Sequence, residues 1–176
     1  MFIRKLKTES GQPTVFNFQV LYGMIFFKII ATFFGTGFIK KGGGTVAALI
    51  TSLMWYFVAE KTSVVSGMLQ QAAIIAVLFI AGVWSGNKVE ADWGKDSYRV
   101  VLDEVLGMCI ALFMIPVTWQ NVLAALILFR FFDIAKPFFI RRMEKFPGGW
   151  GVMLDDVLAG IYANIIVHII LIFHWL

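Results

Sequence analysis

The chain has 176 residues and a net charge of +4, with 60% hydrophobic and only 15% charged residues. Soluble domains average about 45–50% apolar and about 25% charged residues, so this composition excludes an ordinary soluble domain and predicts one integral membrane domain over residues 1–176. The chain has no basic stripe interleaved with aromatic residues. This argues against a nucleic-acid partner and favours anionic lipid headgroups.

Six apolar segments follow one another along the chain, and a membrane-spanning helix needs about 20 mostly apolar residues, with about 17 as a lower limit. They are residues 16–34, 45–59, 64–84, 100–119, 121–140 and 152–176. The first is interrupted by Lys28, interpreted as a lysine that reaches back to the interface. The second is short, and the third is a clear span. The predicted fold is all-α, a polytopic bundle of membrane helices.

The distribution of positive charge predicts the topology. Most Lys and Arg residues lie in residues 1–11, 40–41, 85–99 and 141–145, whereas the alternate loops hold only Lys61. Cytoplasmic loops carry the positive excess, so the N-terminus and the loops near 40, 92 and 144 are expected in the cytoplasm. This gives five crossings, with the first apolar segment interfacial or re-entrant and the C-terminus outside. If that segment crosses, the count becomes six and the N-terminus moves outside.

Two glycine-rich segments directly precede predicted helices on the cytoplasmic side. Residues 35–45 contain five glycines and two lysines, and residues 147–151 contain three glycines. Free backbone N–H groups and the positive end of a helix suit phosphate. We therefore predict that Lys41, Gly44 and Thr45 bind phosphate. The alternative for each segment is a plain flexible connector.

Five carboxylates lie in or at the edges of three predicted spans, where charge is costly and marks functional candidates. They are Asp103, Glu104, Asp133, Asp155 and Asp156. The topology places all of them near the cytoplasmic face, although the three helices are distant in sequence. Such acids repel one another without cations, and oxygen ligands favour Mg²⁺ or Mn²⁺. All five are predicted metal ligands, and helix capping is the alternative for one of the last pair.

Two cations stand beside these acids. Arg130 and Asp133 share one helical face, and Lys136 follows three residues later, just before Pro137. Arg suits bidentate contact with phosphate and Lys suits a point-charge contact, so both are predicted phosphate ligands. Metal, acids and cations at a membrane surface indicate phosphoryl chemistry on a lipid headgroup. The predicted catalytic residues are Asp103, Glu104, Asp133 and Asp156.

The remaining reactive side chains are not expected in this chemistry. Cys109 lies in an apolar run and is expected to pack there, and His168 and His174 lie in the outer half of the last span or beyond it. The chain lacks a Cys-x5-Arg signature, an Asp-x-Asp pair and the histidine set of the lipid phosphate phosphatases. Water activated by a metal ion is therefore the predicted nucleophile.

Several sequence blocks resemble the signature of the phosphatidylglycerophosphatase A family. They are VLDEVLG (101–107), FRFFDIAKP (129–137), GGWGVMLDDVLAG (148–160) and, near the N-terminus, GTG (35–37) with GT (44–45). The likeness runs from about Phe34 to Ala163, but Gly43 stands where the family usually has Pro. The resemblance implies a Mg²⁺-dependent enzyme of the bacterial inner membrane. It would remove the terminal phosphate of phosphatidylglycerophosphate at the cytoplasmic face and yield phosphatidylglycerol.

Two other functions compete with this one. In a small cation transporter the same acids would line an ion path, but that path would need acids near the midplane or on both sides. A phosphatidyl-alcohol transferase also holds metal with aspartates at the membrane edge. Its Asp-Gly-x2-Ala-Arg pattern is absent from this chain.

Overall fold

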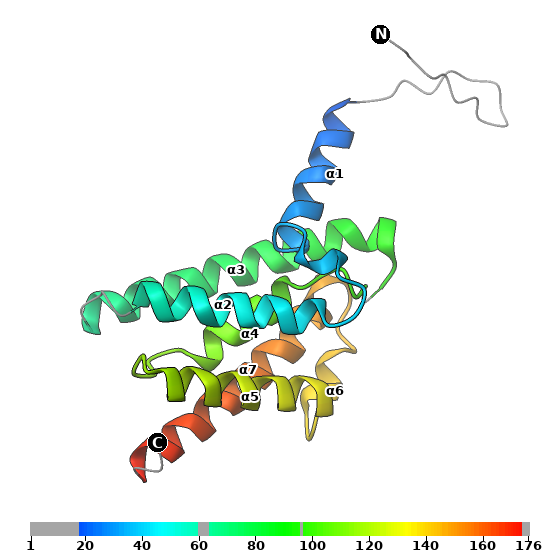
Figure 1. Cartoon of the computed structure of the whole chain (residues 1–176). Coiled ribbons are helices and arrows are strands. Elements are labelled where there is room, and N and C mark those ends of the chain that lie inside the picture. The colour runs from blue at the N-terminus through cyan, green and yellow to red at the C-terminus, as the bar shows by residue number, and fades with distance from the viewer. Residues whose placement is uncertain (1–17, 60–63, 96, 174–176) are drawn as a thin grey trace, which may run out of the picture.

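A computed structural model of the chain describes residues 18–59, 64–95 and 97–173. Within these residues the fold contains α-helices, one 3-10 turn and no strand, so the predicted all-α class is confirmed (Figure 1). The elements are α1 (Phe18–Ala31), η1 (Thr36–Phe38), α2 (Gly43–Ala59), α3 (Val64–Trp93), α4 (Leu102–Ala111), α5 (Trp119–Ala135), α6 (Ile140–Met143) and α7 (Gly149–Ile172). The predictions for residues 1–11, Lys61 and His174 lie outside the described residues.

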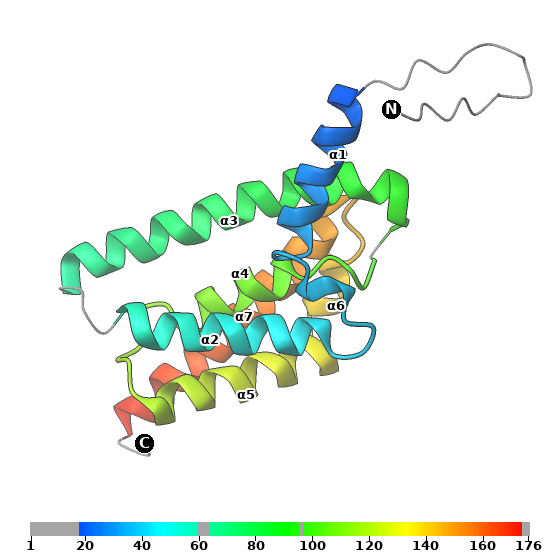
Figure 2. The same ribbon diagram turned by 45° about the horizontal axis from the view of Figure 1, so that its top comes forward.

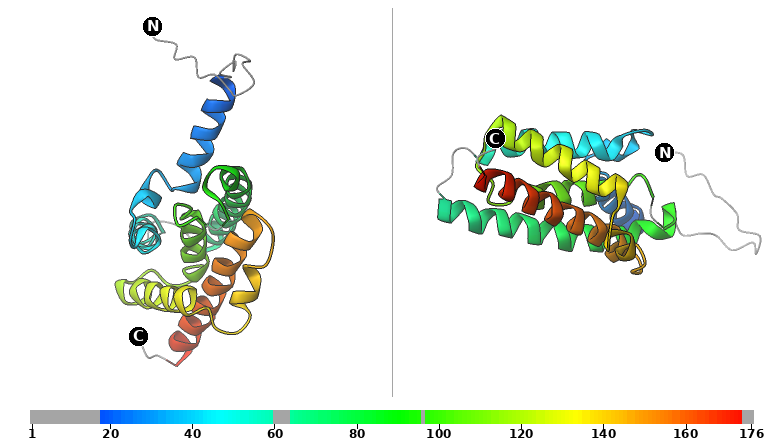
Figure 3. Two further views of the ribbon diagram at one scale, coloured as in Figure 1. Left: turned by 90° about the vertical axis from the view of Figure 1, so that its right-hand side faces the viewer. Right: turned by 90° about the horizontal axis from the view of Figure 1, so that it is seen from below.

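Five helices run side by side along one axis, and α1 crosses them steeply (Figures 1 and 2). Viewed from the side in Figure 3 (left), α4 lies at the centre, surrounded by α2, α3, α5 and α7, all of which contact it. The starts of α2, α4 and α7 lie with the ends of α3 and α5 at one end of the bundle. We call this the carboxylate end, because Asp103, Asp133 and Asp156 all lie on these helix ends.

Glycines set the height of α4 against α7. A Cβ atom on Gly160 of α7 would overlap the carbonyl oxygen of Gly107 in α4, so the two backbones touch at this point. Interfaces between membrane helices use small residues in this way to bring backbones close together. Glu104 and Asp156 lie about one turn before these two glycines. The glycine contact therefore holds the acids of both helices at the same level.

The N-terminus of α7 is held by α3. A Cβ atom on Gly86 would lie 2.9 Å from the Cα of Gly149, and the Asn87 side-chain oxygen accepts a hydrogen bond of 2.7 Å from the Gly149 N–H. Because α7 begins at Gly149, its acids lie in the second turn, deeper than a helix starting at residue 152 would place them.

The prediction of one continuous span over residues 100–119 is wrong. Helix α4 has only ten residues, about 15 Å at 1.5 Å per residue, which is half of a bilayer core of about 30 Å. After it the chain turns at Met114, where φ is 58°, and runs through Pro116, which cannot donate a backbone hydrogen bond. The Asn164 amide satisfies the freed carbonyls of Ala111 and Phe113 at 3.1 and 2.8 Å.

Other boundaries shift for local reasons. Helix α3 continues to Trp93, nine residues past the predicted end, and takes up part of the predicted loop. Helix α5 stops at Ala135 because Lys136 adopts left-handed backbone angles directly before Pro137. Lys28 forms an ion pair of 2.5 Å with Asp92 and lies 5.6 Å from the centre of the Trp93 ring. It therefore joins α1 to the end of α3, a contact that the sequence interpretation did not include.

The outside of the bundle is apolar. Among the described residues, Gly67–Trp93 and Gly149–Ile172 are long and apolar enough to cross a membrane. Leu69, Val77 and Ile80 of α3 are each more than 60% exposed. Such continuous apolar exposure marks a surface that contacts lipid or another protein rather than water. The number of crossings stays a prediction.

Candidate active site

A polar cavity of about 240 Å³ lies at the carboxylate end. It is enclosed by the loop before α2, the loop before α4 and the facing ends of α4, α5 and α7. Eight of the ten predicted site residues line it: Asp103, Glu104, Asp133, Asp155, Asp156, Arg130, Lys136 and Gly44. The exposed Lys41 and Thr45 are not on the lining. The tertiary fold thus brings together acids that lie up to 53 residues apart in the sequence.

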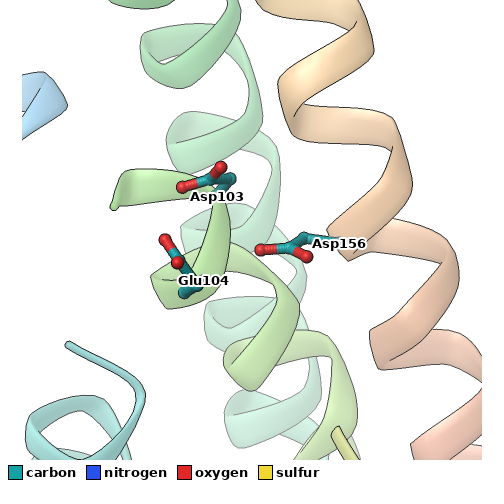
Figure 4. A group of neighbouring side chains, drawn as sticks. All are labelled: Asp103, Glu104 and Asp156. Atoms are coloured by element: carbon teal, nitrogen blue, oxygen red, sulfur yellow. The ribbon is translucent and has the colours of Figure 1, made fainter. Parts of the chain in front are cut away.

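Three of the carboxylates form a compact group. Asp103 and Glu104 from α4 and Asp156 from α7 point toward one another (Figure 4), and one oxygen of each lies within 4.8 Å of the others. Each of the three also has a buried oxygen without a hydrogen-bond partner among the described residues. A buried carboxylate oxygen without a partner is costly. The convergence of the three side chains and their oxygens without partners are both expected of residues that bind a cation.

The other two predicted acids are paired with cations. Arg130 Nη1 lies 2.5 Å from Asp133 Oδ2, and Lys136 Nζ lies 2.6 Å from Asp155 Oδ2. Lys136 also contacts Glu144 Oε1 at 2.7 Å. Arg130 Nη1 also lies 4.0 Å from Glu104 Oε1, at the limit of an ion pair. Of the five acids, Asp103 and Asp156 are the two that form no ion pair within the described residues.

Several donors in the cavity suit phosphate. The Arg130 Nε is buried and has no hydrogen-bond partner in the described part of the chain. Gly43 and Gly44 are the first residues of α2, so their N–H groups have no partner within that helix. A Cβ on Gly44 would overlap the Glu104 carboxylate, which explains why this position needs glycine. Guanidinium and free helix N–H groups are typical phosphate donors.

Cys109 and His168, which we expected to take no part in the chemistry, lie away from the cavity. Cys109 is buried in the apolar core. His168 lies twelve residues after Asp156, about 18 Å along α7, and its Nδ1 is 3.0 Å from the Asn164 carbonyl oxygen.

Some lining residues were missed from the sequence. Lys40, Gly42, Gly43, Ser97 and Tyr98 all line the cavity, and Glu144 contacts it through Lys136. The glycine-lysine segment was recognised, but which of its two lysines faces the cavity depends on where α2 begins. Glu144 lies in a charged loop next to three basic residues, and nothing in its sequence neighbourhood distinguishes it.

Comparison with known proteins identifies the relatives of the chain. The family model for phosphatidylglycerophosphatase A matches residues 29–171. A Bacteroides thetaiotaomicron protein named "Putative phosphatidylinositol-3-phosphatase" is 43% identical over 147 residues, 80% of this chain and 91% of that protein. Phosphatidylglycerophosphatase A of Haemophilus influenzae is 40% identical over 145 residues, 81% and 86% of the two chains. The Escherichia coli enzyme of the same name is 32% identical over 146 residues, 81% of each chain.

No solved structure matches the chain. The family match covers most of the sequence and includes all five carboxylates, Arg130 and Lys136. Two relatives above 30% identity carry the family name and align over four fifths of the chain. The chain therefore belongs to the phosphatidylglycerophosphatase A family, as its sequence blocks predicted.

Proposed function

We propose that the chain hydrolyses the terminal phosphate monoester of phosphatidylglycerophosphate. Water is consumed, the phosphorus–oxygen bond to glycerol breaks, and phosphatidylglycerol and inorganic phosphate are released. The observation that carries this proposal is the cluster of Asp103, Glu104 and Asp156 beside Arg130, in a cavity at one end of an apolar bundle. The names of two relatives support this substrate.

The residues present fit a Mg²⁺ ion held by Asp103, Glu104 and Asp156. One oxygen of each side chain lies within 4.8 Å of the others, and Mg²⁺ takes oxygen ligands, carboxylates among them. When bound, the ion would neutralise phosphate charge and activate water for attack.

The protein groups around the ion have separate tasks in this proposal. Arg130 offers its free Nε to a phosphate oxygen, while Asp133 fixes the guanidinium through Nη1. The N–H groups of Gly43 and Gly44 add donors from the side of α2. Lys136 holds Asp155 in place through its ion pair. Contact of the Lys136 ammonium with phosphate stays a prediction. The metal roles of Asp133 and Asp155 also stay predictions. Lys41 and Thr45 also remain predictions, because they do not line the cavity.

The cavity is proposed to face the cytoplasm of a bacterial cell, with the bundle axis along the membrane normal. Exposed Lys88, Lys95 and Arg141 lie near the carboxylate end, as the positive-inside rule expects. Helix α1 would then lie in the interface, which its steep crossing of the bundle supports (Figure 1). Helix α4 would cross together with the irregular stretch that follows it.

Labelling of single cysteines tests this orientation. In a Cys109→Ala background, Lys95→Cys and Arg141→Cys should react only from the cytoplasmic side, and Gln120→Cys only from the outside. Reaction of residues 95 and 120 from the same side would contradict the proposed topology, because these exposed positions lie at opposite ends of the bundle.

A second substrate follows from the name of one relative. The Bacteroides protein is named for a phosphatase of phosphatidylinositol 3-phosphate, another lipid with a phosphate monoester on its headgroup. A cation transporter is not favoured, because every carboxylate in the described part of the chain lies near the carboxylate end. The two lipids must therefore be compared in one assay.

The decisive experiment measures phosphate release by the purified full chain in detergent micelles. We expect phosphatidylglycerophosphate to be hydrolysed faster than phosphatidylinositol 3-phosphate, and we expect excess EDTA to abolish activity until Mg²⁺ is restored. Preference for the inositol lipid would replace the proposed substrate. Full activity in EDTA would remove the metal from the proposal.

A further inference from the structure

We propose that Lys40 binds the second phosphate of the substrate, the phosphodiester that stays in the product. This inference rests on the proposed function, because only a substrate with two phosphates requires such a contact. Phosphatidylglycerophosphate carries a terminal monoester and an internal diester, joined by a glycerol unit. The cluster of Asp103, Glu104 and Asp156, with its proposed cation, and Arg130 account for the first of these phosphates. Nothing in the site described so far receives the second.

The charges of the cavity single out Lys40. Three cations line it, and Arg130 and Lys136 each contact a carboxylate within 2.6 Å. Lys40 lines the same cavity and forms no ion pair within the described residues. A trianionic headgroup entering a cavity with five carboxylates is strongly repelled without added positive charge. Lys40 is the cation whose charge is still available.

The position of Lys40 suits the outer phosphate. Lys40 is exposed, whereas Asp155 and Asp156 in the same cavity are at least 94% buried. The reacting monoester has to reach the buried acids, so the diester, nearer to the acyl chains, lies toward the exposed rim. A lysine ammonium is a point charge on a flexible stem and tolerates the varied geometry expected there.

The local backbone distinguishes Lys40 from its neighbour Lys41. Gly42 turns the chain with φ of 83°, and α2 begins at the next residue. Lys40 and residues 42–44 then line the cavity, whereas Lys41 does not. The free N–H groups of Gly43 and Gly44 lie on the same wall and add to its positive potential. Two adjacent lysines of equal charge therefore differ in their access to the substrate.

The expected kinetic effect follows from the chemistry. The diester does not change during hydrolysis, so its contact with Lys40 is equally strong in the ground state and in the transition state. Loss of such a contact raises KM and leaves kcat nearly unchanged. For one exposed charged contact we expect an increase in KM of about five- to tenfold.

The test compares Lys40→Gln with Lys95→Gln and Lys88→Gln, which remove the same charge from exposed lysines off the cavity. Phosphate release from phosphatidylglycerophosphate is measured in mixed micelles with saturating Mg²⁺. Lys40→Gln should raise KM, Lys40→Arg should restore it, and the two control variants should stay within twofold of the parent. If Lys95→Gln raises KM as much as Lys40→Gln does, the inference is wrong.

Two soluble competitors show which phosphate is recognised. Deacylated phosphatidylglycerophosphate carries both phosphates, and glycerol 3-phosphate carries only the monoester. The parent should bind the first more tightly, and Lys40→Gln should lose this difference while its affinity for glycerol 3-phosphate is kept. Equal binding of the two by the parent, or an equal loss of both in the variant, overturns the inference. Failure of the parent to hydrolyse the lipid would instead refute the proposed function.

Discussion

The two ends of the α4–α7 pair differ in whether their polar groups have hydrogen-bond partners within the described residues. Past the last turn of α4, the partly buried Asn164 amide donates to the carbonyls of Ala111 and Phe113. At the carboxylate end, Asp103, Glu104 and Asp156 each retain a buried oxygen without a partner among the residues that the structure describes.

This difference is what we expect between a structural site and the proposed active site. Polar groups at membrane depth have to be satisfied, because a backbone or side-chain group without a partner there costs several kcal/mol. Asn164 meets that need with groups of the protein itself. The carboxylates do not, and their mutual repulsion adds to the cost. The proposed cation would offset this cost, whereas the role of Asn164 is complete without a ligand.

The largest effect on phosphate release is expected from Asp156→Asn. The change keeps the shape of the side chain and removes one charge from the proposed metal site, so kcat should fall by about 10²–10⁴. The thermal midpoint in detergent without metal should stay the same or rise, because like-charge repulsion is relieved. The upward shift that Mg²⁺ causes in the parent should disappear. Parent-like turnover by folded Asp156→Asn would end the metal assignment.

Lys136→Met is expected to have the next largest effect. It leaves the buried Asp155 without its cation and frees Glu144 from its contact. Groups that orient metal ligands typically contribute about 10–100-fold to activity, and we expect a loss in that range. Lys88→Met, an exposed change off the cavity, is the control. Unchanged kcat and KM in Lys136→Met would mean that this ion pair serves the scaffold alone.

Gly44→Ala should produce a smaller change that is specific to metal. The added methyl group would displace the Glu104 carboxylate, because a Cβ at this position overlaps it. The Mg²⁺ concentration for half-maximal activity should rise by roughly threefold to tenfold, with less effect at saturation. Gly23→Ala in α1 is the matched control, since a Cβ there meets no atom within 4 Å. An identical Mg²⁺ dependence in both variants would show that Glu104 is not a ligand.

Asn164→Leu should have the smallest effect on turnover. It leaves two carbonyls without their donor and should lower the free energy of unfolding by about 1–3 kcal/mol. Phosphate release per folded molecule should match the parent, as should that of the exposed control Ile165→Leu. A loss of turnover without a loss of stability would contradict the division between the two ends of the helix pair.

Local composition and sequence motifs determined much of this molecule in advance. The apolar runs predicted an all-helical fold, and the blocks at residues 129–137 and 148–160 indicated the family, because hydropathy and motif residues are properties of short segments. Eight of the ten site residues predicted from these patterns line one cavity. The length of the apolar run misled at residues 100–119, where the helix ends at Ala111, Pro116 follows, and Asn164 supplies the missing hydrogen bonds.

Only the tertiary structure decided which acids of the site lie beside cations and which lysine lines the cavity. The sequence presented five carboxylates near one membrane face, whereas the fold pairs Asp155 with Lys136 and brings Glu104 of α4 within 4.0 Å of Arg130. It also places Lys40 rather than Lys41 on the cavity wall. The common level of the acids on α4 and α7 depends on the height of one helix against the other, set by the contact of Gly107 with Gly160. Such contacts join residues far apart in the chain, so no local pattern in the sequence records them.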